Sequence, residues 1–533
     1  MLASMSREGL LVAERLEAAC FPHPVTHLYR RETPISWVLL TGTYAYKIKK
    51  PVQLPFLDAS TLERRHFLCQ EELRLNRRYA ADLYIDVVPI CEHGGRLRVA
   101  GPGKPVEYAV RMREFEPAQE LSQQLALGHV TVAEMAEFGG SLSNWHRSAE
   151  LAPPETGYAT VELIRSQMLQ NFDSLPVCST SAPMRRLAHL QHWTREQLHR
   201  LSPLLQQRRS SQCIRECHGD LHAGNLVHWQ GRWLPFDCLE FAPHLRWIDI
   251  VSDVAFLFMD LLYFGREELG YAFLASYLEH SGDYEALRLL RLYSVYRALV
   301  RAKVAALRTA STAGAHPIAL DARESELQQR VELADRLSEA RAPALILMHG
   351  VTASGKSYVS ARLIAALGAV RVRSDLERRR LVGAGDYSAA ATQSTYERLG
   401  SCTQAALEAG ERIIVDATFL DQRQRRVFEQ LAQRYACPCV IVSCSASPEI
   451  LRRRLGARAR EANDPSEATP EVLERQLARR RSLETSGSAH LVALDTSSDD
   501  TIDSGTDRLR ALLKPAQRFV PPGRRESERG IDR

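Results

Sequence analysis

The sequence predicts two consecutive domains of different fold class: a two-lobed α+β domain, then an α/β domain with a parallel sheet. Over residues 1–320, a few strand-like runs precede long helical stretches, as in domains whose sheet and helices are segregated. After residue 343, short apolar strands alternate with helical segments, which is typical of a parallel sheet covered by helices. A chain of 533 residues can form two or three separate hydrophobic cores.

The composition is that of an ordinary globular protein. Hydrophobic residues make up 45% of the chain and charged residues 25%. The net charge of +5 is too weak to predict nucleic-acid binding by itself. The eleven cysteines are scattered and odd in number, which favours a reduced, cytoplasmic protein. Cys437-Pro438-Cys439 is more typical of a strand edge than of a metal site.

The most apolar stretch, residues 248–264, predicts a buried helix and not a membrane span. Asp249, Asp253 and Asp260 interrupt it, and such charges are costly in lipid. Residues 1–9 are polar, and no signal-peptide cleavage site follows them. We therefore expect a cytoplasmic protein with no membrane partner.

Alternation of apolar and polar residues predicts an antiparallel meander near the N-terminus. We expect strands at Val25–Arg30, Trp37–Thr41, Tyr44–Lys49, Ile85–Ile90, Leu97–Val99 and Tyr108–Phe115. A charged helix is predicted over Leu62–Tyr79. The rest of the first domain reads as mainly helical, with short strands at Leu226–Trp229 and Trp233–Phe236.

Residues 321–342 are charged and alanine-rich, and they predict a helical connector to the second domain, residues 343–514. There we expect strands at Ala344–Met348, Ala369–Arg373, Arg412–Asp416, Val440–Cys444 and His490–Leu494. Residues 515–533 contain Pro521-Pro522-Gly523 among mixed charges and predict a disordered tail.

The strongest motif satisfies G-x-x-x-x-G-K-[ST] in full: Gly350, Val351, Thr352, Ala353, Ser354, Gly355, Lys356 and Ser357. It lies between a predicted strand and a helix over residues 358–367, so backbone N–H groups and a helix N-terminus converge on phosphates. We expect Lys356 to reach the β- and γ-phosphates and Ser357 to bind Mg²⁺. The second domain is thus predicted to bind ATP and Mg²⁺.

Two carboxylates complete this predicted site. Asp416 ends an apolar strand and fits the role of a residue that aligns Mg²⁺ or its water. Asp375 follows another strand, and ligands bind at the carboxyl ends of strands in open α/β sheets. Asp375 could therefore activate the acceptor hydroxyl, although Ser374 or Asp375 could equally cap the following helix.

The second strong motif is the segment Glu216 to Asn225, which contains His218-Gly219-Asp220. Asp220 and Asn225 are five residues apart, the Asp-to-Asn interval of a kinase catalytic loop. Asp237 follows at the end of a predicted strand. Phosphoryl transfer needs such a set: one carboxylate to accept the hydroxyl proton, and an amide oxygen and another carboxylate to hold Mg²⁺.

These residues resemble the aminoglycoside phosphotransferase and choline-kinase-like group, whose fold is that of protein kinases. The resemblance implies that Asp220 is the base, that Asn225 and Asp237 bind Mg²⁺, and that His218 supports the loop. Gly219, where protein kinases carry arginine, is typical of this small-molecule branch.

The same resemblance implies a strand lysine on the α- and β-phosphates, paired with a helix glutamate. Lys47 and Lys49 lie on one face of their strand, so alternation cannot choose between them. We prefer Lys47, which is nearer the strand centre. Glu71 and Glu72 are both suitably placed for the pairing, and we assign Glu72.

Two alternatives remain for this domain. Metal binding by histidines is disfavoured because glycines between them predict a loop; the three are His218, His222 and His228. A degenerate pseudokinase is the stronger alternative, because no glycine-rich nucleotide loop is evident: the segment Leu40-Thr41-Gly42-Thr43 has one glycine.

The run from Leu451 to Arg460 resembles the arginine-bearing lid of small P-loop kinases. Arginines there neutralise charge on the phosphoryl group as the lid closes. Arg452 and Arg458 are the first choices, and a solvated helix face is the alternative. The domain is similar to gluconate-kinase-like, zeta-toxin-like and polynucleotide-kinase-like proteins, all of which phosphorylate hydroxyls.

Nearly the whole chain resembles a family in which an aminoglycoside-phosphotransferase-like domain is fused to a P-loop ATP-binding domain, described as bifunctional. Its further marks here are residues 46–52, Leu73-Arg74-Leu75-Asn76-Arg77-Arg78, and Arg246-Trp247-Ile248-Asp249 with Ser252-Asp253. In this pattern Asp249 and Asp253 could pin the following helix or touch substrate.

The leading hypothesis is a phosphotransferase with two ATP·Mg²⁺ sites, each acting on a hydroxyl of a small molecule. The alternatives are an N-terminal ligand sensor that regulates a C-terminal kinase or ATPase, and a nucleic-acid-end kinase. No aromatic-interleaved basic stretch favours the last. Glu279, Asp283 and Glu285 do not suffice to predict an acidic pocket for a cationic antibiotic.

Overall fold

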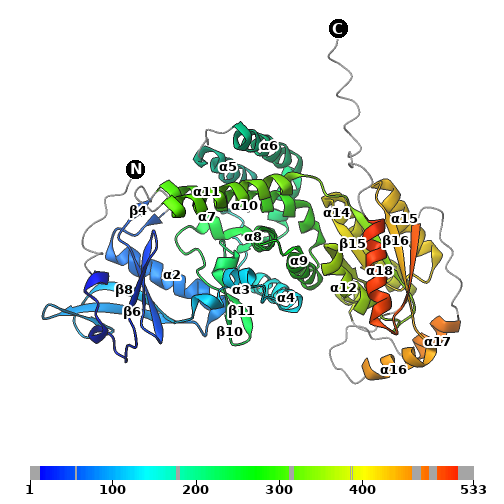
Figure 1. The fold of residues 1–533 in the computed structure, drawn as a ribbon, viewed down its shortest axis with the longest axis horizontal. Helices are drawn as coiled ribbons and strands as arrows, with labels where there is room; N and C mark the ends of the chain where they lie inside the picture. Colours follow the sequence, from blue (N-terminus) through cyan, green and yellow to red (C-terminus); the bar gives the residue numbers. More distant parts are fainter. Residues whose placement is uncertain are drawn as a thin grey trace, which may run out of the picture. The chain divides into compact units, whose positions relative to one another are not determined.

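The computed structural model describes residues 12–54, 57–175, 181–310, 317–383, 386, 388–458, 470–478 and 489–513. The chain forms two compact units (Figure 1). Unit 1 comprises residues 1–130, 145–170 and 198–260, and unit 2 comprises residues 131–144, 171–197 and 261–533. The predicted tail, residues 515–533, lies outside the described residues.

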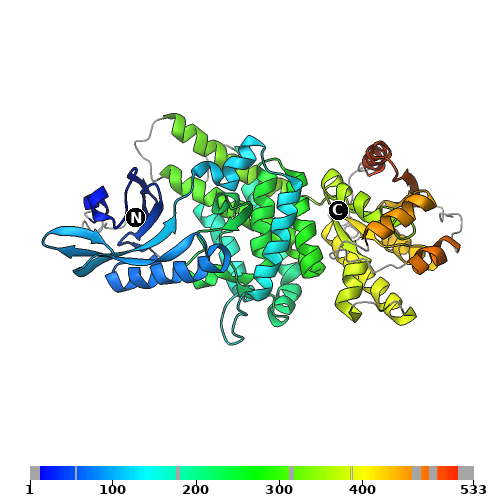
Figure 2. The ribbon, with the colours of Figure 1, turned by 90° about the horizontal axis from the view of Figure 1, so that it is seen from below.

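Unit 1 is built on a six-stranded antiparallel sheet of order β1-β2-β3-β8-β6-β7. Its strands are β1 (Tyr29–Glu32), β2 (Ser36–Leu40), β3 (Tyr44–Lys49), β6 (Tyr84–His93), β7 (Arg96–Val99) and β8 (Lys104–Arg113). Helix α2 (Leu62–Ala80) packs along β6 and β8, as Figure 2 shows in blue. The predicted strand Tyr44–Lys49 has the predicted bounds, whereas the first strand begins later than expected.

Strand β3 separates two cores. Tyr46 and Ile48 enter one apolar cluster with Trp37, Leu39 and Ile90. Ala45, on the opposite face, joins the cluster that includes Leu75 and Tyr79 of α2. Since side chains alternate along a strand, Lys47 and Lys49 also project toward the α2 side.

The remainder of unit 1 carries short elements. These are β4 (Gln53–Leu54), β5 (Leu57–Asp58), α3 (Leu121–Leu127), β9 (Ile214–Glu216), η3 (Ala223–Asn225), β10 (Leu226–Trp229), β11 (Arg232–Pro235), α7 (Pro243–Arg246) and β12 (Trp247–Asp249), with η1 (Ala18–Cys20) and η2 (Pro117–Gln119). Strands β10 and β11 form a hairpin, and β9 pairs with β12. Four helices have residues in both units: α4 (Val132–Ser148), α5 (Val161–Ser174), α6 (Ser181–Ser210) and α8 (Ile250–Tyr263).

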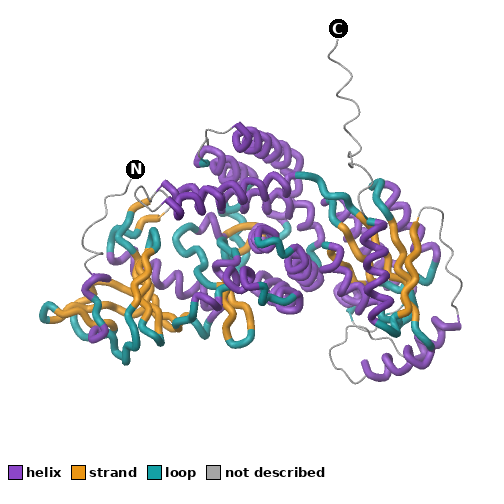
Figure 3. Tube along the Cα trace, in the orientation of Figure 1, coloured by secondary structure: helices purple, strands orange, loops and turns teal. Residues whose placement is uncertain are grey.

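Unit 2 contains a five-stranded, fully parallel sheet of order β14-β15-β13-β16-β17, drawn in orange in Figure 3. The strands are β13 (Ala344–His349), β14 (Ala369–Arg373), β15 (Arg412–Asp416), β16 (Cys439–Ser445) and β17 (Ala489–Asp495). In β13, β15 and β16 the interior residues are apolar and buried, as expected for a sheet covered by helices, whereas β14 carries the buried Arg371 and β17 is partly exposed. The predicted fold class is confirmed for both parts of the chain.

The helices of unit 2 alternate with these strands or precede them. They are α9 (Glu267–Ser281), α10 (Leu287–Ala310), α11 (Pro317–Ser338), α12 (Lys356–Leu367), α13 (Ser374–Val382), α14 (Ala389–Ala409), α15 (Gln422–Arg434), α16 (Pro448–Arg458), α17 (Pro470–Ala478) and α18 (Asp499–Leu512), with η4 (Tyr284–Ala286) after α9. Helix α9 packs against β14 and α12 and is buried along most of its length. No helix among the described residues is long and apolar enough to cross a membrane.

Gly139 marks the closest approach in unit 2 between α4 and α9. A Cβ atom added there would lie 2.3 Å from Phe273 O and 3.1 Å from Tyr277 N, both backbone atoms. We expect Gly139→Ala to lower stability by about 1–3 kcal/mol, because the helices must separate. Gly400→Ala in α14 is the matched control, because its Cβ would meet nothing within 4 Å. The higher helix propensity of alanine should raise the free energy of unfolding of this variant by as much as about 1 kcal/mol. Thermal unfolding of both variants checks this, and equal midpoints would contradict it.

Candidate active sites

Two lysines of β3 share one glutamate of α2. Lys47 Nζ lies 2.8 Å from Glu72 Oε1, and Lys49 contacts both Glu72 and Glu240. Glu72 and Glu240 are buried, and so are the two lysines. Glu71 instead pairs with Arg74 at 2.9 Å. Glu72 is therefore the residue that meets the strand lysines, as the assigned pairing requires.

Lys47 differs from Lys49 in also contacting Asp237, the predicted Mg²⁺ ligand. Desolvation alone would raise the pKa of Asp237, but Lys47 outweighs it and the pKa is lowered. Burial would lower the pKa of Lys47, yet Asp237 and Glu72 hold it well above its ordinary value. Asp237 follows β11 with φ +62°, a conformation that non-glycine residues adopt mainly at special sites.

The other two residues of the predicted set lie in one loop after β9. Asn225 Nδ2 donates to Asp220 Oδ2 at 3.1 Å and to Asp220 O at 3.0 Å. The negative charge of Asp220 acts on Asp237, whose pKa it pushes upward. Asp220, Asn225, Asp237 and Lys47 are thus gathered at one place in unit 1.

His218 holds this loop against the segment that leads to Asp237. Its Nε2 lies 2.9 Å from Phe236 O, and burial lowers its pKa, so the ring is neutral near pH 7. Gly219 has φ +85°, and a Cβ there would lie 2.7 Å from Leu245 O. A side chain at this position would strain the loop beside Asp220, which explains the glycine.

Two of the three aspartates in the apolar stretch, Asp253 and Asp260 of α8, bind the backbone of the same loop. Asp253 accepts from His218 N at 2.7 Å and from Gly219 N at 2.9 Å. Asp260 accepts from Ala223 N at 2.9 Å. Asp249 forms a buried ion pair with Arg208 at 2.7 Å. Of the two roles left open for Asp249 and Asp253, the structure shows the anchoring one.

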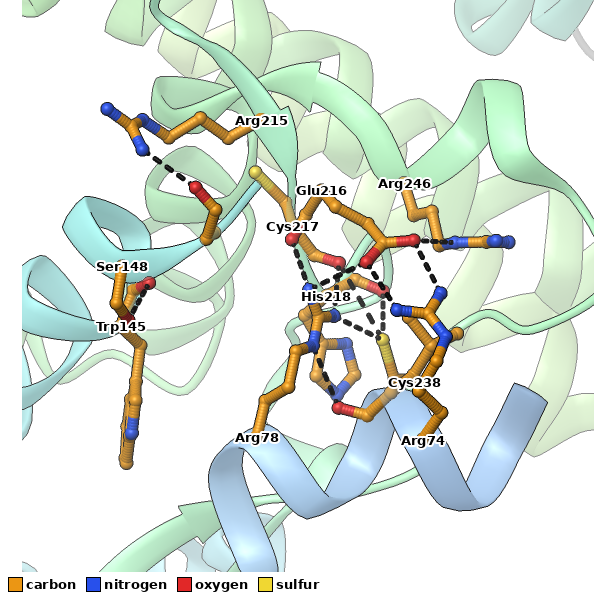
Figure 4. A network of polar contacts seen from close by, with 12 residues as sticks. Arg74, Arg78, Trp145, Ser148, Arg215, Glu216, Cys217, His218, Cys238 and Arg246 are labelled. Atoms are coloured by element: carbon orange, nitrogen blue, oxygen red, sulfur yellow. Dashed lines mark hydrogen bonds and ion pairs between the residues drawn. The ribbon is translucent and has the colours of Figure 1, made fainter. Parts of the chain in front are cut away.

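Glu216, just before the loop, is a residue that the sequence did not single out for a role (Figure 4). Its carboxylate, 2% exposed, accepts from Arg74 at 2.8 and 3.0 Å, Arg78 at 3.2 Å and Arg246 at 3.1 Å. Burial would raise the pKa of Glu216, but these arginines lower it. The arginines belong to the segments 73–78 and 246–249 that marked the family resemblance, so these segments meet at the base of the loop.

Of the three histidines considered as metal ligands, two contact Asp220: Asp220 N donates to His218 Nδ1 at 3.3 Å, and His222 Nε2 lies 3.5 Å from Asp220 Oδ2. His218 bonds to Phe236 O, as described above. His222 Nδ1 accepts from Gly224 N at 3.0 Å. The ring of His228 packs on Trp233 with centroids 5.0 Å apart.

In unit 2, the predicted phosphate loop connects β13 to α12. Gly350 has φ +142°, and a Cβ there would lie 2.5 Å from Cys444 O and 2.6 Å from Ser354 Oγ. Lys356 Nζ donates to Val351 O at 2.8 Å, across the turn of the loop. Within the described residues, the buried Ser354 Oγ has no hydrogen-bond partner. The tight glycine turn and this hydroxyl fit a loop that accommodates phosphate oxygens.

Asp416 and Asp375 lie at the carboxyl edge of the sheet. Asp416 pairs in register with Met348 of β13 and Arg373 of β14. Burial raises the pKa of Asp375 first and the charge of Asp416 raises it further, while Arg373 and Lys356 oppose the rise. Helix α13 begins at Ser374 with Arg373 at the N-cap, so neither Ser374 nor Asp375 caps it. The charges of Asp416 and Lys356 therefore both influence the pKa of Asp375.

Among the described arginines of α16, Arg454 and not the predicted Arg452 is linked to the phosphate loop. Arg452 forms an exposed ion pair with Glu474 of α17 at 2.9 Å, and the side chain of Arg458 lies outside the described residues. Arg454 instead donates to Thr496 Oγ1 at 2.9 Å, and that hydroxyl donates to Ser354 O at 3.0 Å. One helical turn separates Arg454 from Arg458 and a single residue separates it from Arg452, so basic composition alone could not distinguish them.

Helix α17 also contacts the phosphate loop. Gln476 of α17 accepts from Thr352 N at 2.7 Å. Leu473 packs with Val351 and Ala353 in one apolar cluster with Leu451. Helices α16 and α17 therefore both pack against the phosphate loop.

The AAA domain family matches residues 345–483. Uncharacterized proteins of Mycobacterium tuberculosis and Mycobacterium bovis are each 30% identical over 489 residues, which are 88% of this chain and 94% of theirs.

Two solved structures are also similar to parts of this chain. A choline/ethanolamine kinase family protein from Mesorhizobium loti is 12% identical, with 61% of this chain and 99% of that chain covered and a TM-score of 0.37. A gluconokinase from Sinorhizobium meliloti is 20% identical, with 32% and 94% covered and a TM-score of 0.24. The chain belongs to the same family as the two mycobacterial proteins, and within it residues 345–483 form an AAA-family domain.

Proposed function

We propose that this protein is an ATP- and Mg²⁺-dependent phosphotransferase with two nucleotide sites, each transferring the γ-phosphate to a hydroxyl of a small molecule. The observation that carries the proposal is that each unit gathers its own set of phosphate-handling residues. Unit 1 combines Lys47 with Asp237 and the Asp220–Asn225 pair. Unit 2 combines its phosphate loop with Asp416 and Asp375.

In unit 1, Asn225 and Asp237 would hold Mg²⁺, and Lys47 would hold the nucleotide phosphates. The bound ion would neutralise charge on the phosphates. Asp220 is placed to take the proton of the acceptor hydroxyl, because the amide of Asn225 fixes its carboxylate at 3.1 Å. His218, Asp253 and Glu216 keep the loop in place through the backbone and the arginines described above.

In unit 2, Ser357 and Asp416 would hold Mg²⁺, and the backbone of residues 350–357 would bind the phosphates. Asp375 takes the acceptor proton when ionised. Arg454, linked to the loop through Thr496, is the described lid arginine best placed to neutralise transferring charge. Arg452 and Arg458 remain predictions for that role.

The two sites should be separable by substitution. We expect Asp220→Asn to lower turnover on one acceptor by roughly 10²–10⁴-fold, because a general base is lost. Lys356→Ala should lower turnover on a different acceptor by on the order of 10²-fold, because a charge that stabilises the transition state is lost. ADP release with Mg·ATP across sugars, nucleosides, aminoalcohols and oligonucleotide ends provides the measurement.

Asp82→Asn and Lys104→Ala are matched controls, because both change the same charges at exposed positions. If Asp220→Asn changes nothing while Lys356→Ala ends all activity, unit 1 is a ligand sensor. Transfer confined to oligonucleotide ends would identify a nucleic-acid-end kinase.

Lys47 and Lys49 should differ in effect. Lys47→Met leaves Glu72 paired with Lys49, so the fold should persist while kcat/KM for ATP at the unit 1 site falls by on the order of 10²-fold. Lys49→Met leaves buried Glu240 without its ion-pair partner, which should cost about 3–5 kcal/mol of stability. Steady-state kinetics and thermal unfolding of both variants decide the assignment. Normal ATP kinetics in Lys47→Met would transfer the phosphate role to Lys49.

The unit 2 reaction should lose rate at acidic pH. A carboxylate base works only when ionised, and burial and Asp416 raise the pKa of Asp375 above its ordinary value of 3.8. The value of kcat/KM should therefore fall as pH decreases through this raised pKa, at a higher pH than for a solvated aspartate. A pH–rate profile in the Asp220→Asn background tests this. Asp375→Asn should remove roughly 10²–10⁴-fold of the rate, and unchanged turnover in that variant would exclude Asp375 as the base.

A further inference from the structure

A buried ion pair joins helix α9 to the parallel sheet within unit 2. Glu279 lies in the last turn of α9, and Arg371 lies in the middle of β14. Arg371 Nη2 donates to Glu279 Oε2 at 3.1 Å, and Nε donates to the other carboxylate oxygen. Both side chains are only 9% exposed. By sequence, Glu279 belongs to the first predicted domain and Arg371 to the second.

The third guanidinium nitrogen of Arg371 reaches the phosphate-loop region. Nη1 donates to Ser360 Oγ at 2.9 Å and to Ser357 O at 3.2 Å. Ser357 is the last residue of the loop motif, and Ser360 lies one turn further along α12. One planar fork therefore binds Glu279 on one side and the first turn of α12 on the other.

Ser360 extends this contact to Asp416. Its Oγ lies 3.1 Å from Asp416 Oδ2 and 3.2 Å from Ser357 O. Since Oγ carries a single proton and already accepts from Arg371, it can donate to only one of these two oxygens at a time. A donation to Asp416 fixes the carboxylate next to Ser357, the other residue expected to bind Mg²⁺.

The carboxylate of Glu279 offsets the free-energy cost of burying the Arg371 guanidinium. Burial would lower the pKa of Arg371, but Glu279 first and Asp416 to a smaller extent raise it. A buried guanidinium without its carboxylate would be costly. Tyr284, in η4 just after α9, adds a second contact by donating to Arg371 O at 2.7 Å. Both the side chain and the backbone of Arg371 are thus held from the α9 side.

We propose that Glu279 is a positioning residue of the phosphate-loop nucleotide site. Glu279 orients Arg371, and Arg371 in turn fixes the positions of Ser357 and Ser360 next to Asp416. Helix α9 therefore contributes to the nucleotide site of unit 2. This inference rests on the nucleotide-binding function proposed for that site. It gives the Glu279 carboxylate a role that the sequence analysis did not predict. It also implies that residues 343–514, without α9, lack the ion pair that orients Arg371.

The test measures Mg·ADP binding by calorimetry to the full-length protein in an Asp237→Ala background, where only the unit 2 site should bind. We expect Glu279→Gln and Arg371→Lys to weaken binding by roughly 10–100-fold, as for residues that orient metal ligands. Arg371→Lys keeps the charge that faces Glu279 but lacks the fork that reaches Ser357 and Ser360. The loss should be much smaller for ADP with EDTA, because Ser357 and Asp416 act through Mg²⁺.

Glu267→Gln is the matched control on the same helix. Its exposed ion pair with Arg341, at 3.0 Å, does not continue to the phosphate loop, so binding should be unchanged. Wild-type Mg·ADP affinity in Glu279→Gln and Arg371→Lys would overturn the inference. The inference would also be overturned if both variants lost ADP affinity equally with and without Mg²⁺, in proportion to their lower unfolding midpoints. That result would mark a purely structural role for Glu279 and Arg371. If the Asp237→Ala parent bound no Mg·ADP, the proposed site itself would fail, and the inference with it.

Discussion

The buried charge cluster around Glu72 is the constraint on which unit 1 depends. Lys47, Lys49, Glu72 and Glu240 are all buried, and Asp237 lies at the partly exposed edge of the group. Each charge loses water at a cost of several kcal/mol, so the cluster is stable only when every member is paired. The pairing fixes β3, α2 and the segment after β11 in one arrangement. Three carboxylates against two lysines leave one negative charge in excess, which favours a cation at the exposed edge, beside Asp237.

Helix α2 transmits this constraint to the loop that carries Asp220. One face of the helix meets the lysines through Glu72. The next turn contributes Arg74 and Arg78 to Glu216, and Asn76 accepts from Cys238 N at 2.9 Å, directly after Asp237. A rigid helix that contacts the lysines, the segment of Asp237 and the base of the loop keeps their spacing constant, which is the preorganisation that the proposed phosphoryl transfer requires.

Sequence patterns predicted what is local and missed what is long-range. Strands β3, β14 and β15 have the predicted bounds because alternation or an apolar run defines them. Strand β1 was placed too early, because it is an edge strand whose four residues are all exposed and carry no apolar pattern. The phosphate loop is a contiguous motif and was predicted in full. Glu216, Glu240 and Arg454 were missed, because their roles come from partners distant in sequence that no spacing rule identifies.

The parallel sheet of unit 2 packs against a helix that precedes the predicted second domain in the sequence, namely α9. Helix α9 is apolar on most of its surface and is buried against β14 and α12. Two polar side chains of α9 make specific contacts: Tyr271 donates to Glu411 at 2.8 Å, and Glu279 forms an ion pair with Arg371. A helix buried on several faces cannot be removed without exposing apolar surface and leaving Arg371 as an unpaired buried charge. The parallel sheet therefore depends on residues that precede the connector, although the phosphate-loop motif and Asp416 follow it.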